Sequence, residues 1–240
     1  MVQIIRILQS QKLEKLSEGY TMENTEQLMK KLLDILDKNS TDANVVNEKS
    51  NEIPIGISNR HIHLSQLDLE QLFGSGYQLT KLKDLKQPGQ YASKEMVTIA
   101  GPKGCFTNVR VLGPARSHSQ VEISKSDNFA LGIKAPVRES GDIKNSAALT
   151  VIGPRGTVNM ESKVIVSKRH IHMTPSDAVH FRVCDKEEVW VKTTGERAAV
   201  LGEVVVRVHE QFRLECHLDM DEANAISVRD DDYVEIYKPY

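Results

Sequence analysis

Ser58-Asn59-Arg60-His61-Ile62-His63-Leu64-Ser65 occurs a second time in nearly the same letters, as Ser167-Lys168-Arg169-His170-Ile171-His172-Met173-Thr174. Four of the eight histidines lie in these two copies. Isoleucines alternate with other residues just before the first copy, which favours a β-strand. On a strand, residues two apart share a face, so both histidines of each copy point to one side and the isoleucine between them to the other. Each copy is therefore expected to present two imidazoles at a strand end.

A duplicated histidine pair predicts a metal or catalytic site. Filling a core with four imidazoles would leave each needing a hydrogen-bond partner, whereas clustered imidazoles are usual zinc ligands. Two further residues are candidate ligands. His217 lies on the polar face of a strand whose other face is apolar, and Glu122 alternates with Val121 and Ile123. Three protein ligands with an open position are typical of catalytic zinc, and four closed ligands of structural zinc.

The composition limits the classes of function. The 31 basic and 33 acidic residues give a formal charge of −2, so the overall balance does not predict a nucleic-acid partner, although local basic groups could bind small anions. The three cysteines, Cys105, Cys184 and Cys216, are far apart, which predicts a reducing compartment and no disulfide framework. No apolar run is long enough for a membrane span, and no signal peptide is indicated. These features predict a soluble intracellular protein.

From residue 52 onward the pattern is that of a mainly β protein. Short alternating segments are separated by Gly-Pro turns, and a short helix is expected after each histidine pair, with Ser65 and Thr174 as N-caps and Asp68 and Asp177 three residues later. A third short helix is expected over 221–226. In a duplicated chain this predicts two small barrels or sandwiches, capped by short helices and related by a pseudo-twofold axis. The expected strands span 97–100, 107–112, 120–124, 149–152, 157–160, 188–192, 203–208, 212–218 and 233–237.

The first 51 residues have a different composition. Residues 1–38 are predicted to be helical, and 24–38 form an amphipathic segment with a narrow apolar stripe. Residues 39–51 are polar and have the composition of a linker. Such a helix either packs on its own globular body or docks on another protein; its attachment through a linker favours docking.

Beyond these patterns, the sequence resembles the PduL-type phosphate propanoyltransferases, the phosphotransacylases of bacterial microcompartments. The resemblance runs from about Ile53 to Ala225, with the motifs in the same order. They are Ser58-Asn-Arg-His-Ile-His63, Gln87-Pro-Gly-Gln-Tyr-Ala92, Gly101-Pro-Lys-Gly104, Asn108-Val-Arg-Val-Leu-Gly-Pro114, Gln120-Val-Glu-Ile-Ser124, Arg169-His-Ile-His172 and Leu214-Glu-Cys-His-Leu-Asp219 with Asp221-Glu-Ala-Asn-Ala225.

The resemblance implies two β-barrels, one from residues 52–59 and 168–240 and one from 60–167, with two zinc ions in the cleft between them. It implies that one zinc is bound by His61, His63 and Glu122, with the coenzyme A sulfur as a further ligand. The second would be bound by His170, His172 and His217. The implied coenzyme A contacts are Ser58, Lys83, Arg110, Leu112 and Asn224, and Arg116 is the implied phosphate-handling arginine.

The implied reaction converts propanoyl-coenzyme A, or a similar short acyl-coenzyme A, and phosphate into acyl phosphate and coenzyme A. It needs no covalent acyl-enzyme. Residues 1–51 resemble an encapsulation peptide that docks to microcompartment shell or cargo proteins, which places the protein in a microcompartment lumen within the cytoplasm, and a homo-oligomer is expected. The extension is longer than usual, so residues 1–20 either add a second helix or precede an alternative start at Met22. Two other hypotheses are a dinuclear zinc hydrolase of thioesters or phosphoesters and a structural zinc module.

Overall fold

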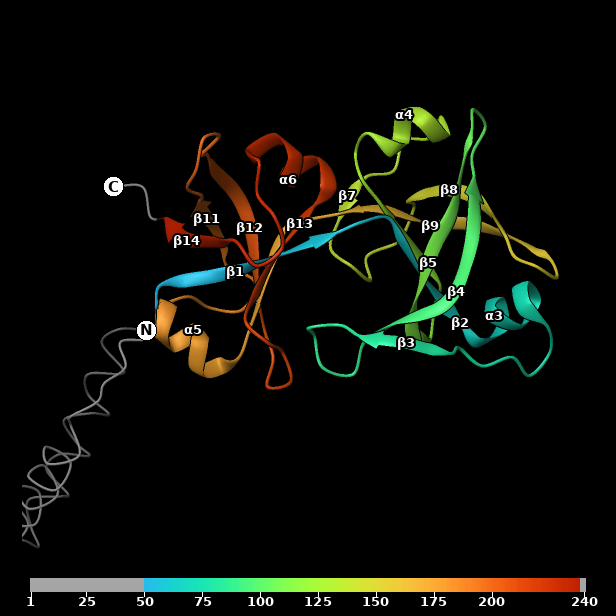
Figure 1. The fold of residues 1–240 in the computed structure, drawn as a ribbon, viewed down its shortest axis with the longest axis horizontal. Coiled ribbons are helices and arrows are strands. Elements are labelled where there is room, and N and C mark those ends of the chain that lie inside the picture. Colours follow the sequence, from blue (N-terminus) through green and yellow to red (C-terminus); the bar gives the residue numbers. More distant parts are fainter. Residues whose placement is uncertain (1–49, 238–240) are drawn as a thin grey trace, which may run out of the picture. The chain divides into compact units, whose positions relative to one another are not determined.

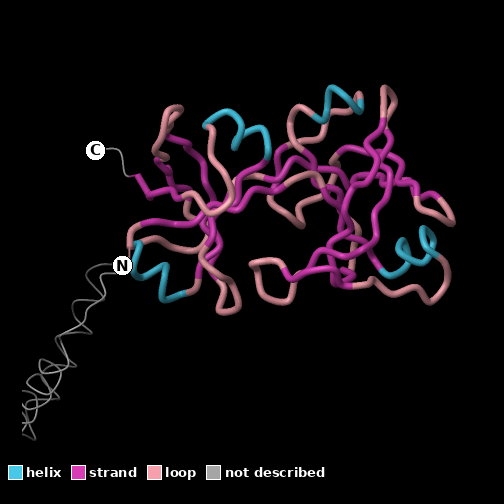
Figure 2. The backbone as a smooth tube through the Cα atoms, viewed as in Figure 1, coloured by secondary structure: helices cyan, strands magenta, loops and turns pink. Residues whose placement is uncertain are grey.

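The computed structural model describes residues 50–237, and these are mainly β, as predicted (Figures 1 and 2). The strands form two structures, a closed barrel and a larger sheet. The predicted N-terminal amphipathic helix and nearly all of its linker lie outside the described residues. Within them, no helix has the length and apolar character needed to cross a membrane. The helices are α3 (Gln66–Phe73), α4 (Asp127–Leu131), α5 (Pro175–Phe181) and α6 (Met220–Ile226).

The closed barrel has six strands in the order β1, β13, β10, β12, β11 and β14. Its strands are β1 (Glu52–Ser58), β10 (His170–Met173), β11 (Glu188–Lys192), β12 (Val200–Val208), β13 (Glu215–Asp219) and β14 (Tyr233–Tyr237). Alternate residues such as Ile53, Ile55 and Ile171 are fully buried and pack in one apolar cluster. The barrel therefore encloses a core built from one early strand and the C-terminal third of the chain.

The larger sheet has eight strands, paired in the order β3, β4, β5, β2, β6, β9 and β7, with β8 paired to both β4 and β9. Its strands are β2 (His61–Ser65), β3 (Lys81–Asp84), β4 (Tyr91–Ala100), β5 (Cys105–Arg116), β6 (Gln120–Ile123), β7 (Val137–Arg138), β8 (Ala147–Ile152) and β9 (Thr157–Ser167). Because β8 joins β4 to β9, the strands β4, β5, β2, β6, β9 and β8 pair in a closed circuit. A second apolar cluster, which includes the fully buried Ile62 and Leu64, fills this structure.

The two histidine strands have matching neighbours. In the larger sheet β2 pairs in parallel with β5 and antiparallel with β6, and in the barrel β10 pairs in parallel with β12 and antiparallel with β13. In each case the isoleucine between the two histidines is fully buried in the core. The histidines therefore lie on the opposite face of their strand, as the alternation predicted.

The chain crosses between the two structures immediately before each histidine pair. Only Asn59 and Arg60 separate β1 of the barrel from β2 of the sheet, and only Lys168 and Arg169 separate β9 of the sheet from β10 of the barrel (Figure 1). Alternation alone predicted an alternating strand that ends in the histidines. In the structure this stretch is two strands, one on each side of the crossover. Both histidine strands therefore begin at the place where the barrel and the sheet meet.

The predicted helix starts after the histidine pairs are confirmed. Ser65 accepts a hydrogen bond from the backbone N–H of Asp68 at the start of α3, and Thr174 does the same for Asp177 at the start of α5. The third expected helix is α6, which begins one residue earlier than predicted, with Asp219 as its N-cap. These caps satisfy backbone N–H groups that have no partner within the helix.

Other boundaries differ from the sequence prediction. Strand β13 begins at Glu215, whereas 212–218 was expected, because Phe212 donates its backbone N–H to the His209 carbonyl, 3.0 Å away, in a turn. Strands β3 and β7 and helix α4 were not predicted. Each is only two to five residues long, too short to show a period in the sequence.

Candidate functional site

The first cluster consists of His61, His63 and Glu122. The two histidines lie on β2, with ring centroids 5.1 Å apart, and Glu122 lies opposite His61 on β6. Directly opposed residues of an antiparallel pair share a face, so β6 adds its carboxylate to the two imidazoles. One ligand atom from each of the three lies within 4.8 Å of the other two.

The second cluster consists of His170, His172 and His217. His170 and His172 lie on β10, and His217 lies opposite His170 on β13, where the rings stack with centroids 4.8 Å apart. The ligand atoms again lie within 4.8 Å of one another. The structure thus brings together all six residues predicted as metal ligands, in two groups of three.

Backbone carbonyls fix one tautomer at the first histidine of each pair. His61 Nδ1 lies 2.8 Å from the carbonyl oxygen of Asn59, and His170 Nδ1 lies 2.8 Å from that of Lys168. A carbonyl can only accept, so Nδ1 carries the proton and Nε2 is left with a lone pair directed into the cluster. His61 Nε2 is 3.7 Å from Glu122 Oε2, a separation close to that of two ligands of one tetrahedral zinc, about 3.4 Å.

Other ring nitrogens in the clusters are buried without a hydrogen-bond partner among residues 50–237. They are Nδ1 of His63, both ring nitrogens of His172, and Nε2 of His217. A buried polar atom without a partner costs free energy, and a metal ion would supply the missing interaction. Two histidines with a carboxylate, and three histidines, are also established ligand sets for catalytic zinc. The residues present therefore fit two zinc ions.

The local electrostatics keep these residues in the protonation state that binds metal. Burial and the neighbouring His217 and Arg207 lower the pKa of His170 to about 3, and burial beside His170 lowers the pKa of His172 to about 2. Burial would raise the pKa of Glu122, but His61, His63, the hydrogen bond from Ser140 and His170 together lower it to about 2. At neutral pH His170 and His172 are therefore neutral imidazoles and Glu122 is a carboxylate, which are the forms that coordinate zinc.

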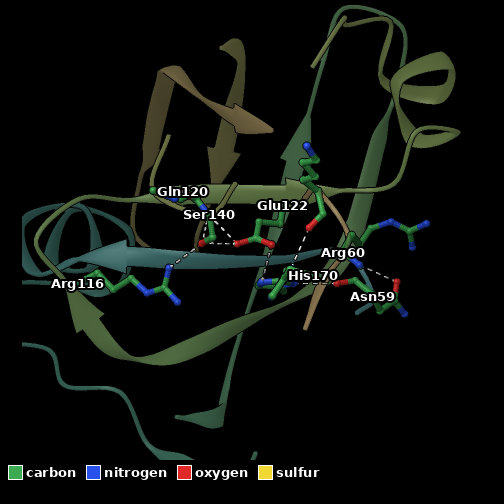
Figure 3. A network of polar contacts seen from close by, with 10 residues as sticks. Asn59, Arg60, Arg116, Gln120, Glu122, Ser140 and His170 are labelled. Carbon is green, nitrogen blue, oxygen red and sulfur yellow. Dashed lines mark hydrogen bonds and ion pairs between the residues drawn. The ribbon is translucent and has the colours of Figure 1, made fainter. Parts of the chain in front are cut away.

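The two clusters lie close together across the junction of the barrel and the sheet. His170 of the second cluster helps to lower the pKa of Glu122 in the first, and Figure 3 shows both side chains in one polar network. The arginine at each crossover anchors a nearby helix. Arg60 binds both carboxylate oxygens of Asp127 in α4, at 3.0 and 2.8 Å, and Arg169 lies 3.2 Å from Glu222 in α6. In each copy of the Ser-x-Arg-His segment, the arginine therefore contacts a helix and the histidine that follows it belongs to a cluster.

Arg116, the predicted phosphate-handling residue, lies at the end of β5 and faces the first cluster (Figure 3). Its guanidinium donates to Ser140 Oγ at 3.5 Å, and Ser140 donates to Glu122 Oε1 at 3.0 Å. Burial lowers the pKa of Arg116, while Glu122 opposes that shift. A half-buried arginine beside two prospective cations is suited to holding an anion.

The residues predicted to contact coenzyme A fall into two groups. Arg110 and Leu112 on β5 are in register with His61 and His63, and the exposed Lys83 lies two strands away on β3. Ser58 is in register with Asp219, the N-cap of α6, and α6 carries the exposed Asn224. Arg110 donates to two backbone carbonyls, those of Ser93 and Lys94, at 3.0 and 3.1 Å. These residues therefore flank the first cluster and α6.

Four residues near the clusters were missed by the sequence analysis: Gln120, Ser140, Arg207 and Glu215. Gln120 and Glu215 precede a candidate ligand by two residues, so strand alternation could have placed them on the same face. Arg207 lies in register with His172, which required knowing that β12 pairs with β10. Ser140 lies between short elements and gave no pattern.

Comparisons with known proteins agree with this geometry. The family model described as Phosphate propanoyltransferase matches residues 54–229. A phosphate propanoyltransferase of Thermotoga maritima is 54% identical over 185 residues, covering 77% of this chain and 88% of that protein. One of Clostridioides difficile is 53% identical over 173 residues, covering 72% and 83%, and one of Rhodopseudomonas palustris is 49% identical over 187 residues, covering 78% and 83%. The match includes both clusters, and the chain belongs to the phosphate propanoyltransferase family of acyltransferase enzymes.

Proposed function

We propose that this protein transfers a propanoyl or similar short acyl group between coenzyme A and phosphate. In the forward direction a phosphate oxygen attacks the thioester carbonyl carbon, the carbon–sulfur bond breaks, and acyl phosphate and coenzyme A thiolate are formed. The observation that carries the proposal is that two clusters with the composition of metal sites lie with Arg116 at one junction. The names of the relatives support the same reaction.

Two zinc ions are proposed at this site, one held by His61, His63 and Glu122 and one by His170, His172 and His217. Zinc would supply Lewis acid chemistry, which stabilises a thiolate and neutralises phosphate charge. The residues of the chain hold the ligands in place: the Asn59 and Lys168 carbonyls fix the first histidine of each pair. Such outer contacts set ligand orientation and metal affinity.

Arg116 is proposed to bind phosphate beside the first cluster, where its planar guanidinium can donate two hydrogen bonds to one anion. Holding phosphate next to the thioester makes the attack effectively intramolecular. Direct attack also agrees with the environment of Cys216, which is fully buried in the barrel core and whose pKa burial raises to about 12. A thiol with that pKa is not a nucleophile at neutral pH.

Coenzyme A is proposed to lie along the first cluster and α6, in contact with Ser58, Lys83, Arg110, Leu112 and Asn224. We also propose that residues 52–59 with 168–240, and residues 60–167, are two barrel domains that arose by duplication. The repeated segment and the matching neighbours of β2 and β10 support this division. A pseudo-twofold relation would place equivalent strands on both sides of the substrate.

One assay tests the reaction: release of free thiol from propanoyl-coenzyme A by the zinc-loaded protein, with and without phosphate. Phosphate-dependent release, with acyl phosphate as the second product, is expected. Equal release without phosphate would favour the hydrolase hypothesis, and no release would favour a structural zinc module. Zinc content measured on the same sample separates a missing metal from a missing activity.

Residues 1–51 are proposed to dock on microcompartment shell or cargo proteins, which would place the enzyme in a microcompartment lumen, and a homo-oligomer is proposed. The amphipathic sequence of 24–38 and the polar linker that follows it support docking. Deleting residues 1–45 should keep full activity and abolish co-purification with shell proteins. A folded but inactive deletion would contradict a separate docking role.

A further inference from the structure

Glu215 is a buried carboxylate beside the second cluster. Its side chain is 5% exposed, and its Oε2 lies 3.1 Å from Nε2 of His217, two residues along β13. Glu215 is not one of the residues whose ligand atoms group within 4.8 Å, so it contacts one member of the second cluster and not the whole. Because Glu215 contacts only one candidate ligand, it is suited to orienting that ligand and not to binding the metal as a fourth ligand.

The larger sheet holds this carboxylate in place. Gln87 Nε2 donates to Glu215 Oε2 at 3.0 Å and Lys86 Nζ lies 3.2 Å from Glu215 Oε1, both from the loop between β3 and β4. Gln87 also donates to the carbonyl of Arg213 at 3.0 Å. On the other side is Gly56, where a Cβ would lie 2.5 Å from Glu215 Oε1. The surroundings thus fit a carboxylate in one position.

The first cluster has a different side chain at the matching place. Gln120 precedes Glu122 by two residues, lies opposite His63, and donates from Nε2 to Glu122 Oε1 at 2.6 Å. Glu215 lies opposite His172 in the same way. In each cluster the outer residue suits its ligand chemically: an amide donates to the Glu122 carboxylate, and a carboxylate, which can only accept, lies beside the His217 imidazole.

We propose that Glu215 is the positioning residue of His217. With metal bound, its carboxylate would accept the N–H of His217 Nε2, which lies 3.1 Å away and has no hydrogen-bond partner among residues 50–237. This contact would direct Nδ1 into the second cluster and make that nitrogen a stronger donor to a metal. Lys86 and Gln87, in the loop between β3 and β4 of the larger sheet, would then fix the orientation of His217 in the barrel by holding Glu215. The inference rests on the proposed zinc sites and assigns to Glu215 a role in the affinity of one of them.

The test measures zinc binding and not turnover. The wild-type protein, Glu215→Gln and Glu215→Ala are titrated with zinc against a chelating indicator. One of the two zinc affinities is expected to fall about 10- to 100-fold in Glu215→Ala, and less in Glu215→Gln, because the amide oxygen still accepts a hydrogen bond. The other zinc should bind as in wild type. Glu235→Gln, an exposed carboxylate on β14, is the matched control and should change neither affinity.

Two further measurements separate this role from a purely structural one. Cobalt loaded in place of zinc should give an altered absorption spectrum for one ion in Glu215→Gln. Gln87→Ala removes a hydrogen bond to Glu215 without touching the ligands, and should weaken the same zinc by a smaller factor. Wild-type affinities in Glu215→Ala and Gln87→Ala would overturn the proposal, as would equal loss of both ions. A wild-type protein that binds no zinc would instead overturn the proposed metal centre.

A separate observation concerns Arg207 on β12. It is in register with His172 on the parallel strand β10, so its side chain shares the face of the second cluster. Its guanidinium carbon lies 5.7 Å from the centroid of the Phe212 ring, which stacks on His172 at 4.1 Å. Burial and, more weakly, the charge of Arg207 lower the pKa of Arg116. Within residues 50–237, neither has a carboxylate oxygen within 4.0 Å.

We infer that Arg207 is a second phosphate-binding residue, which faces Arg116 from the barrel. Arg116 lies beside the first cluster and Arg207 on the face of the second. Two guanidinium groups in this setting repel one another unless an anion lies between them, and a phosphate dianion can accept from both. This inference also rests on the proposed reaction. Arg207 would bind the substrate directly, whereas Glu215 acts through His217.

Kinetics and direct binding test this role together. Arg207→Ala should raise KM for phosphate about 10- to 100-fold, leave KM for propanoyl-coenzyme A within about twofold, and keep both zinc ions. Arg213→Ala, an exposed neighbour, is the control and should behave as wild type. Calorimetric titration with inorganic phosphate should show the same loss, independent of turnover. Unchanged phosphate affinity in Arg207→Ala would overturn the inference, whereas a wild-type protein without transferase activity would overturn the proposed function.

Discussion

The two clusters share a pattern of strand pairing and differ in one ligand. Each has two histidines on a short strand and a third residue on the antiparallel neighbour, which is Glu122 in the larger sheet and His217 in the barrel. With a divalent cation, the first cluster would keep one unit of positive charge and the second would keep two. The first then matches a thiolate with one negative charge, and the second a phosphate dianion.

The difference shows how one repeated framework could serve two substrates. A common strand arrangement fixes the histidines, and a single residue on β6 or β13 sets the charge of the site. The outer contact changes with the ligand, Gln120 beside the carboxylate and Glu215 beside the imidazole. The two clusters therefore differ both in one ligand and in the residue beside that ligand. Substitutions at these positions should have effects of different size.

Removing a ligand should have the largest effect. His170→Ala is expected to release one of two zinc ions and to lower kcat/KM about a thousandfold or more, because the phosphate charge is no longer neutralised. Metal analysis of the purified variant and the phosphate-dependent thiol assay measure both changes. His180→Ala, a histidine of α5 outside both clusters, is the control. Full activity in a His170→Ala protein that holds one zinc would show that the second cluster is not needed.

Removing the phosphate contact should cost somewhat less and should spare the metals. Arg116→Ala is expected to keep two zinc ions and lose about 100- to 1,000-fold in kcat/KM, since one anchoring donor for the anion is gone. Arg138→Ala, an exposed arginine of β7, is the control. The measurement is zinc content together with steady-state kinetics. Full activity in the Arg116→Ala enzyme would show that Arg116 does not bind phosphate, and the clusters would then differ only through their ligands and the residues beside them.

Exchanging the distinguishing ligands should give unequal results. Glu122→His is expected to keep its metal, because Gln120 can turn its carbonyl oxygen toward an imidazole, and to slow turnover about tenfold through the extra positive charge. His217→Glu places a carboxylate beside Glu215, and the repulsion should weaken that zinc by about 100-fold. Zinc titration of both variants measures the difference. Equal zinc affinities would mean that the outer residues do not distinguish the clusters.

Much of this arrangement was predictable because strand alternation is a local property. The phase of residues 120–124 and 212–218 placed Glu122 and His217 on the faces opposite the apolar residues of their strands, and Ser65 and Thr174 marked the helix starts. The ring-nitrogen contacts with Asn59 and Lys168 lie two residues away along the chain and repeat with the motif. Local patterns of this kind leave a clear trace in a sequence.

What could not be predicted depends on distant contacts. Glu215 and Gln87 are 128 residues apart, and nothing near either residue indicates the other. The crossovers at Asn59 and Lys168 interrupt stretches whose alternation continues into the histidines, so the change of sheet is invisible in the alternation and was expected only from the family resemblance. Helix α4 is held by the Arg60–Asp127 pair and not by its own period. Tertiary contacts decide these features.

The smallest expected difference concerns the helix caps beside the two histidine strands. Asp68 of α3 is buried, accepts from Ser119, and lies 3.3 Å from Lys163, in addition to its bond with the cap Ser65. Burial alone would raise the pKa of Asp68, but these partners lower it below its ordinary value. Its charged form therefore stabilises the fold above pH 4 or so, and that contribution is lost as the pH falls further.

Asp68→Asn should thus lower the free energy of unfolding by about 1 to 2 kcal/mol at pH 7, and Asp177→Asn at the matching place in α5 by about 0.5 kcal/mol. Urea unfolding of both variants and wild type, at one fixed zinc concentration, measures the difference. As the pH falls below the ordinary aspartate pKa of about 4, the effect of Asp68→Asn should shrink, because the unfolded wild-type chain then takes up a proton that the folded protein takes up only at lower pH. Equal losses for the two variants at pH 7 would mean that Ser119 and Lys163 add nothing to the cap, and that the two halves are alike at this position.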